Sequence, residues 1–257
     1  MNLLFNETPR LFGPFHLTML VIVCTAAVLF FLKVRKESRQ DLLRMLHRLG
    51  LIMIIMECFK QWFVLRYVYP DFSLWFFPWQ LCSMAMYCSF FVTMVKKKYQ
   101  PVLLVFLSTF SFFSAIVALA VPSDMLRPQI LLALHGFIYH GLIILESLIA
   151  VTYLKRTQGS ERIRFAPAAG LFLIMCGVAE VINCIGHYLL PDHRPEPDMF
   201  YITPFYPSTQ PVCDIVAARL GILPEVVIYC AVIILISWLF FLIEFKLIPS
   251  GEKFSES

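Results

Sequence analysis

Charged residues are scarce in this chain. Of its 257 residues, 15% are charged, 60% are hydrophobic and 25 are phenylalanine. Soluble domains carry about 25% charged residues, so the shortage excludes an ordinary soluble domain and predicts a protein that crosses a membrane several times. The sequence also has no Gly/Ser-rich linker, low-complexity tract or obvious repeat. We therefore expect a single membrane domain over residues 1–257.

The eight cysteines do not have the pattern of a disulfide-rich domain. Seven of them fall in apolar segments, where cysteine behaves as a small hydrophobic residue, and Cys213 lies in a predicted loop. This distribution excludes a disulfide scaffold and leaves the redox state of the compartment open.

Long apolar stretches define the expected fold. A helix needs about 20 mostly apolar residues to cross the hydrocarbon core of a bilayer, and seven stretches meet this need. Five of them have a proline at or near the start, where its missing N–H is not required. The prediction is an all-α bundle of seven transmembrane helices. The expected spans are residues 15–33, 43–69, 78–95, 101–121, 128–154, 166–190 and 222–247.

Lysine and arginine lie mainly on one side of this topology. Fifteen of them follow the first, third, fifth and seventh spans, and only five lie on the other side. The positive-inside rule then predicts an outer N-terminus and a short cytosolic tail, residues 248–257. The longest outer connection, residues 191–221, is rich in proline and aromatic residues. It can be a lid over the outer end of the bundle or an ordinary loop at headgroup level.

The second span contains charged residues that need an explanation. Glu57, Lys60 and Gln61 lie on one helix face, and each unpaired charge in hydrocarbon costs roughly 2.5–3.5 kcal/mol on insertion scales. Glu57 and Lys60 can neutralise each other at i, i+3 while facing neighbouring helices. Alternatively, they line a polar cavity.

Polar side chains of other spans fall at a similar depth, between mid-membrane and the outer surface. His140, for example, is about 18 Å along the fifth span at 1.5 Å per residue. One such residue can be a packing contact, but a group from five spans favours a shared cavity that opens outward. Glu146 and Glu244 lie deeper or nearer the cytosol and are left out. Besides Glu57, Lys60 and Gln61, the residues expected to line this cavity are His16, Gln80, Cys82, Ser83, His135, His140, Glu180, Asn183 and His187.

Four short motifs occur in order between about residues 45 and 235: "ECFKQW", "PWQLCS", "YHGLII" and "MFYI…P…CD…LG.LP". Together they resemble the YwaF family of integral membrane proteins, which includes animal transmembrane protein 164. The resemblance implies seven spans. For the animal members it implies phospholipid acyl transfer in the endoplasmic reticulum, with a cysteine at the outer start of span three and a histidine in span five.

The histidine of that pattern matches His140, but the cysteine does not carry over directly. In the animal pattern proline is followed by cysteine and histidine, whereas Pro78 is followed here by Trp79 and Gln80. Cys82 lies three positions further, where the bacterial-type pattern also has Leu-Cys-Ser, and three residues turn a helix by about 300°. The chain resembles the bacterial members more, and for these the resemblance implies no reaction.

Several functions fit these residues. In an acyltransferase, Cys82 would be the nucleophile and His140 its base, with Glu57 or Glu180 orienting the base. The alternative for Cys82, which its apolar surroundings favour, is a small packing residue. The same cavity could instead serve a carrier or receptor for a small molecule or ion. The expected substrate-binding residues are Lys60, Gln61, Gln80, His135, Glu180, Asn183 and His187.

A zinc hydrolase fits less well. Catalytic zinc needs three protein ligands, and His135 and His140 are about 140° apart around a helix. We therefore predict no metal and no cofactor. The basic residues lie where topology requires them, so we expect membrane lipids as partners and no nucleic acid. The oligomeric state is open.

Overall fold

The structure, a computed structural model, is mainly helical, with turns and loops between the helices. Leu4 and Gln129 form an isolated β-bridge, and none of the described residues belongs to a strand. The prediction of an all-α fold is therefore confirmed. The described residues are 4, 7–68, 74–122, 124–157, 163–190, 195–210 and 212–247, without the side chains of 246 and 247.

Five helical stretches are long and apolar enough to cross a membrane. They coincide with the predicted spans 15–33, 101–121, 128–154, 166–190 and 222–247, so five of the seven expected crossings have the required helices. The stretches are Pro14–Val34 (α1), Lys97–Ala120, Ile130–Thr157 (α6), Ala166–Leu189 (α7) and Ile222–Phe245.

Two of these stretches consist of several elements. The second contains a 3-10 turn, an α-helix, a π turn and a further α-helix, and the fifth ends in a π turn. Their bounds are Lys97–Tyr99 (η2), Gln100–Phe106 (α4), Leu107–Ser111 (η3), Phe112–Ala120 (α5), Ile222–Leu242 (α9) and Ile243–Leu247 (η5).

The two remaining predicted spans are helical but differ from the other five. Arg39–Tyr67 (α2) has 29 residues and many charges. Ser83–Phe91 (α3) has nine residues, so the helix is much shorter than the expected 78–95. Before it come the 3-10 turn Leu74–Phe76 (η1) and the non-helical residues 77–82. The Pro78 carbonyl in this segment accepts the Tyr87 hydroxyl at 3.1 Å.

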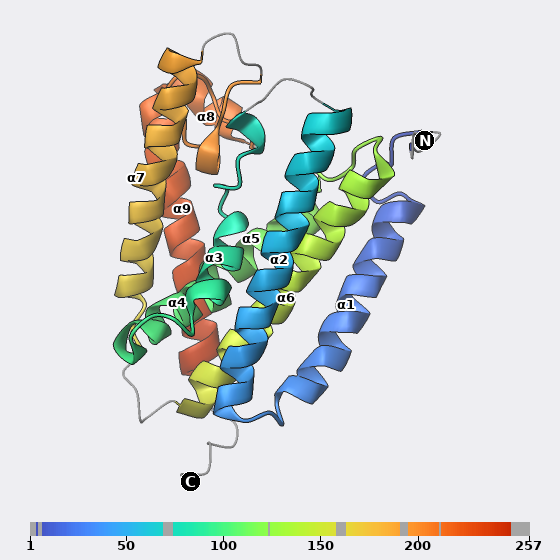
Figure 1. The fold of residues 1–257 in the computed structure, drawn as a ribbon. Helices are drawn as coiled ribbons and strands as arrows, with labels where there is room; N and C mark the ends of the chain where they lie inside the picture. Colours follow the sequence, from blue (N-terminus) through green and yellow to red (C-terminus); the bar gives the residue numbers. More distant parts are fainter. Residues whose placement is uncertain are drawn as a thin grey trace.

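The helices pack in one bundle (Figure 1). On one side α6 contacts α1 and α2, on the other lie α7 and α9, and α3, α4 and α5 fill the space between. The short helix Cys213–Leu220 (α8) packs against α9. The start of α1 and the end of α9 lie at opposite ends of the bundle.

Large apolar side chains cover the outside of the bundle. Ile174 and Val227, for example, are 67% exposed, as is expected where the surrounding solvent is lipid. Inside, the Phe110 ring stacks on Phe106, Phe165 and Phe172 with centroid distances of 5.1, 5.6 and 5.0 Å. These stacked rings join α4, the π turn and α7.

Glycine allows α2 and α3 to approach closely. A Cβ on Gly50 would lie 2.5 Å from the Phe90 backbone nitrogen and 2.7 Å from the Ser89 hydroxyl oxygen. Small residues at such contacts are typical of helix packing in membranes. The close approach places the polar part of α2 beside the start of α3.

Candidate functional site

The charged residues of α2 form an ion pair inside the bundle. The Lys60 ammonium lies 2.8 Å from Glu57 Oε1, and the two side chains are 23% and 6% exposed. The Gln61 amide donates to the same Glu57 oxygen at 2.6 Å and also to the Phe76 carbonyl. Glu57 and Lys60 thus satisfy each other, as their i, i+3 spacing allows.

Groups from two other segments lie within electrostatic reach of this pair. Cys82, His135 and His140 all lie close enough for the charge of Lys60 to act on them. We name Glu57, Lys60, Cys82, His135 and His140 the Lys60 cluster. Its members come from α2, from α6 and from the residue that precedes α3.

The two histidines of the Lys60 cluster have different surroundings. His140 is nine-tenths buried, and its Nδ1 lies 2.8 Å from the Gly136 carbonyl. With a proton on Nδ1, the Nε2 atom is left as the proton acceptor. His135 stacks on Tyr139 with a centroid distance of 5.5 Å, and its buried Nε2 has no hydrogen-bond partner.

Cys82 directly precedes α3 and carries a free, partly buried thiol. Both Lys60 and Glu57 act on it electrostatically. No hydrogen bond joins Cys82 to His140 among the described residues, so this structure does not contain an assembled nucleophile–base pair. It contains a thiol, Cys82, and an imidazole, His140, that are both within electrostatic reach of the Lys60 ammonium.

Gln80 and Asn183 lie in a second group, against the connection between α7 and α8. The Asn183 amide donates to the Met199 carbonyl at 3.3 Å and accepts the Met199 N–H at 2.7 Å. Gln80 donates to the Asp198 carbonyl and accepts the Phe200 N–H, both at 2.8 Å. We name these two side chains the amide clamp, because together they fix three consecutive residues of backbone.

The clamped segment is part of the predicted outer loop 191–221. Asp198, Phe200 and Thr203 are buried, and Phe200 has a φ of 60°, which is uncommon for a residue with a side chain. The described part of the loop thus enters the end of the bundle at which α7 ends. Residues 191–194 and 211 of this prediction lie outside the described residues.

The remaining predicted residues are dispersed. Glu180 lies beside Asn183 and within electrostatic reach of Asp198. His187 stacks on Phe205 at 3.8 Å, with Nδ1 3.3 Å from Glu196 Oε2.

His16 accepts the Phe12 N–H at 3.0 Å, and its Nε2 lies 2.8 Å from the Leu119 carbonyl. Both ring nitrogens of His16 therefore form hydrogen bonds with backbone groups. The structure thus places the predicted residues in two neighbouring groups and at two outlying positions.

Two buried residues that the sequence analysis did not select lie on α6, the helix that carries His135 and His140. Glu146 is fully buried, and the Ser89 side chain is a polar neighbour that acts on it. The Tyr139 hydroxyl is buried without a partner and lies within electrostatic reach of Glu57, Cys82 and Glu146. Tyr139 and Glu146 share a helix face at i, i+7, and this spacing was the available signal.

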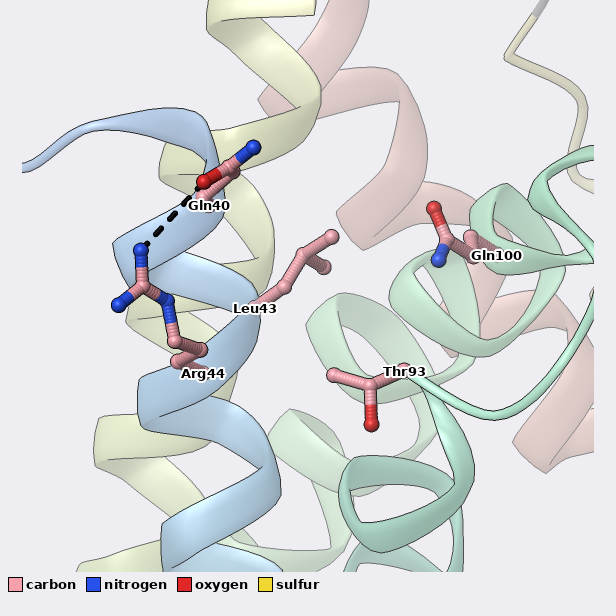
Figure 2. A pocket seen from close by; sticks show the side chains of 5 residues that line it. All are labelled: Gln40, Leu43, Arg44, Thr93 and Gln100. Atoms are coloured by element: carbon pink, nitrogen blue, oxygen red, sulfur yellow. Dashed lines mark hydrogen bonds between the residues drawn. The ribbon is translucent and has the colours of Figure 1, made fainter.

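A hollow of about 290 Å³ occurs elsewhere, at the other end of α2 (Figure 2). The part of the chain that the structure describes contains no group of three or more His, Cys, Asp or Glu side chains that could hold a metal ion.

Membrane-length apolar helices around buried ionisable side chains define an all-helical integral membrane protein. The model of the TMEM164 family matches residues 11–243, and the chain belongs to this family. The resemblance found in the motifs is thereby confirmed. No curated protein and no solved structure matches the chain.

Proposed function

We propose that the chain crosses the membrane seven times and transfers acyl groups of phospholipids at the Lys60 cluster. The two additional crossings are α2 and the segment that contains α3. In this proposal the N-terminus is outside and the C-terminal tail is cytosolic. The membrane is the plasma membrane in a bacterium, or the endoplasmic reticulum or another endomembrane in a eukaryote.

The lengths and contacts of these two segments support the topology. The 29 residues of α2 exceed the roughly 20 that a crossing needs, and its central charges are paired. Figure 1 shows α2 antiparallel to both α1 and α6. Non-helical backbone is tolerated at membrane depth where protein surrounds it, and the bonds of the Gln80 side chain hold the segment of residues 198–200 against residue 80.

The acyl chemistry follows from the groups around Lys60. Nε2 of His140 takes the thiol proton of Cys82, and the sulfur attacks the ester carbonyl of a phospholipid. The ester C–O bond breaks, His140 returns the proton to the leaving lysophospholipid oxygen, and a thioester remains on Cys82. A lysophospholipid hydroxyl or water then attacks the thioester, its proton passes through His140, and the Cys82 thiol is restored.

One observation supports this proposal: Cys82, just before α3, and His140, on α6, both lie within electrostatic reach of Lys60. The Lys60 ammonium is placed to stabilise negative charge on the carbonyl oxygen. Catalytic hydrogen bonds often form fully only when substrate binds, so the mechanism requires the Cys82–His140 contact to close in the lipid complex.

The test uses purified protein in phosphatidylcholine nanodiscs with a labelled acyl chain and added lysophospholipid. Wild type is expected to transfer label and to form a hydroxylamine-sensitive adduct, and Cys82→Ala and His140→Ala are expected to lose both. Cys58→Ala, which removes an exposed thiol of α2, is the matched control and retains them. Undiminished turnover in Cys82→Ala contradicts the mechanism. Lipid profiles of a deletion strain, rescued by wild type or by His140→Ala, supply the physiological readout.

A second candidate is a carrier or receptor that binds a small anionic ligand in the same place. It is favoured by the central position of Lys60 and by the lack of a Cys82–His140 hydrogen bond in the described structure. Uptake or binding that is insensitive to loss of both Glu57 and Lys60 counts against this candidate.

A further inference from the structure

The hollow at the other end of α2 has polar side chains on two sides, and the larger part of its lining surface is apolar. Arg44 and Gln40 of α2 form one side, Thr93 and Gln100 form the other, and Leu43 lies between them (Figure 2). Arg44 is about 24 Å from Lys60 along the helix, at 1.5 Å per residue. The hollow is thus separate from the Lys60 cluster and lies near the opposite end of the bundle.

The Arg44 guanidinium has N–H donors that are available to a ligand. One terminal nitrogen of its guanidinium lies 3.4 Å from both Gln40 Oε1 and Asp41 Oδ1, which are long contacts, and the side chain is 58% exposed. A guanidinium has five N–H donors in a planar arrangement that matches phosphate oxygens. The remaining donors are free to bind an anion.

The opposite wall is held in place by the turn between α3 and α4. The Gln100 amide donates to the Val92 carbonyl at 3.1 Å, and this bond fixes the wall beside the hollow. The Thr93 hydroxyl lies 3.4 Å from Nδ1 of His47, a long contact that leaves the hydroxyl able to serve a ligand. The hollow therefore has donors on both sides.

Further positive charge surrounds the hollow. Lys96, Lys97 and Lys98 are all exposed in the turn that connects Thr93 to Gln100, and Arg48 is exposed one helical turn after Arg44. Asp41 is the acidic neighbour that Arg44 contacts. The balance favours a ligand with negative charge, and basic sites between helices at the cytosolic face are the kind that hold lipid headgroups.

Apolar surface adjoins these charges. Phe91 at the end of α3 and Met94 just after it are exposed large apolar side chains. A ligand with a phosphate in the hollow could lay hydrocarbon chains over Phe91 and Met94. The volume of about 290 Å³ lies near the lower limit for small-molecule sites, so it suits a headgroup without its chains.

We propose that this hollow binds the headgroup of an anionic phospholipid, with Arg44 on the phosphate and Thr93 and Gln40 on the remaining polar groups. The acyl chains lie outside it, on Phe91 and Met94. The proposal is independent of acyl transfer at the Lys60 cluster. Under the proposed topology it concerns the cytosolic leaflet.

Native mass spectrometry of the full chain, released from nanodiscs of phosphatidylcholine with phosphatidylglycerol, measures the lipid that stays bound. Wild type is expected to retain phosphatidylglycerol over phosphatidylcholine. Arg44→Gln should weaken this retention about tenfold, the loss expected for one charge-assisted contact. Arg35→Gln removes an exposed charge from the α1–α2 connection, outside the residues that line the hollow, and should leave retention unchanged.

Two outcomes overturn the proposal. Equal losses in Arg44→Gln and Arg35→Gln mean that diffuse charge, not a site, attracts the lipid. Displacement of phosphatidylglycerol by inorganic phosphate at equal concentration means that the site recognises free phosphate. If Arg44→Gln does not fold, Arg44→Lys and Thr93→Val replace it: each should bind less phosphatidylglycerol than wild type, and unchanged binding in both also overturns the proposal.

Discussion

Lys60 contacts Glu57 across 2.8 Å, one turn back along α2, in the interior of a membrane protein. The carboxylate is almost fully buried, and the Gln61 amide donates to the same oxygen at 2.6 Å. Each charge offsets part of the free-energy cost of burying the other. The two residues therefore act as one unit. Removing one charge should destabilise the protein much more than removing both.

Lys60→Met should destabilise the protein by on the order of 3 kcal/mol, because it leaves Glu57 as an uncompensated buried charge. The double variant Glu57→Gln/Lys60→Met should recover much of this loss, since no charge then remains. Thermal unfolding in detergent measures both. Lys97→Met, in an exposed turn, is the control and should behave as wild type. A double variant no more stable than Lys60→Met would refute the view of the pair as one unit.

Gly50→Ala should separate α2 from α3. The added methyl group would clash with the Phe90 backbone and the Ser89 hydroxyl, and overpacking of this kind costs about 1–3 kcal/mol. Gly177→Ala is the matched control, because a Cβ there meets no atom within 4 Å. Alanine favours a helix over glycine, so Gly177→Ala should be neutral or stabilising. Equal thermal midpoints for the two variants would argue against the close approach.

Asn183→Leu should release the clamped segment from α7. The change removes two hydrogen bonds to Met199 and leaves its buried N–H without a partner, a loss of about 2–3 kcal/mol. Hydrogen exchange of residues 198–203 should rise, while exchange in α6 stays as in wild type. Gln40→Leu, which removes an exposed amide near the start of α2, is the control and should leave the exchange of residues 198–203 unchanged. Unchanged protection of the segment in Asn183→Leu would contradict the clamp.

Asp198 should make stability depend on pH. Burial raises the pKa of its carboxyl from 3.8 to about 7; the Thr203 N–H opposes the rise, while Glu225 and Glu180 add to it. Between about pH 4 and 7 the folded protein holds a proton that the unfolded chain has released, so stability falls as pH rises through this window.

The comparison is between thermal midpoints at pH 5 and pH 8. Wild type should lose stability at the higher pH, and Asp198→Asn, which keeps the oxygen that accepts the Thr203 N–H at 3.1 Å, should lose less. Asp41→Asn removes a more exposed carboxyl and serves as the control, with the slope of wild type. A wild-type slope in Asp198→Asn would mean that other groups cause the dependence.

The sequence predicted the features that depend on local composition. Five apolar spans correspond to helices of membrane length, and the i, i+3 spacing of Glu57 and Lys60 led to the pair that is present. The short length of α3 was not predictable in this way. Residues 78–82 are apolar enough for a helix, and what holds them otherwise includes hydrogen bonds to backbone 118 and 120 residues away.

The candidate site was predictable in part for the same reason. Depth along a span can be counted, but rotation about the helix axis and pairing between helices cannot. Gln80 and Asn183 were selected by depth, and their amides are used by the backbone of residues 198–200. Glu146 was set aside by depth, yet it is buried on the face of α6 that it shares with Tyr139.

The long-range bonds of Gln80 also set an order for biosynthesis. At about 5–20 residues per second, a ribosome that has made residue 80 needs roughly 6–24 s to reach residue 200. During that time the Gln80 amide, just before α3, lacks the backbone partners that it finally binds. Chains that stop before residue 198 should therefore leave the segment before α3 less ordered than it is in the finished protein.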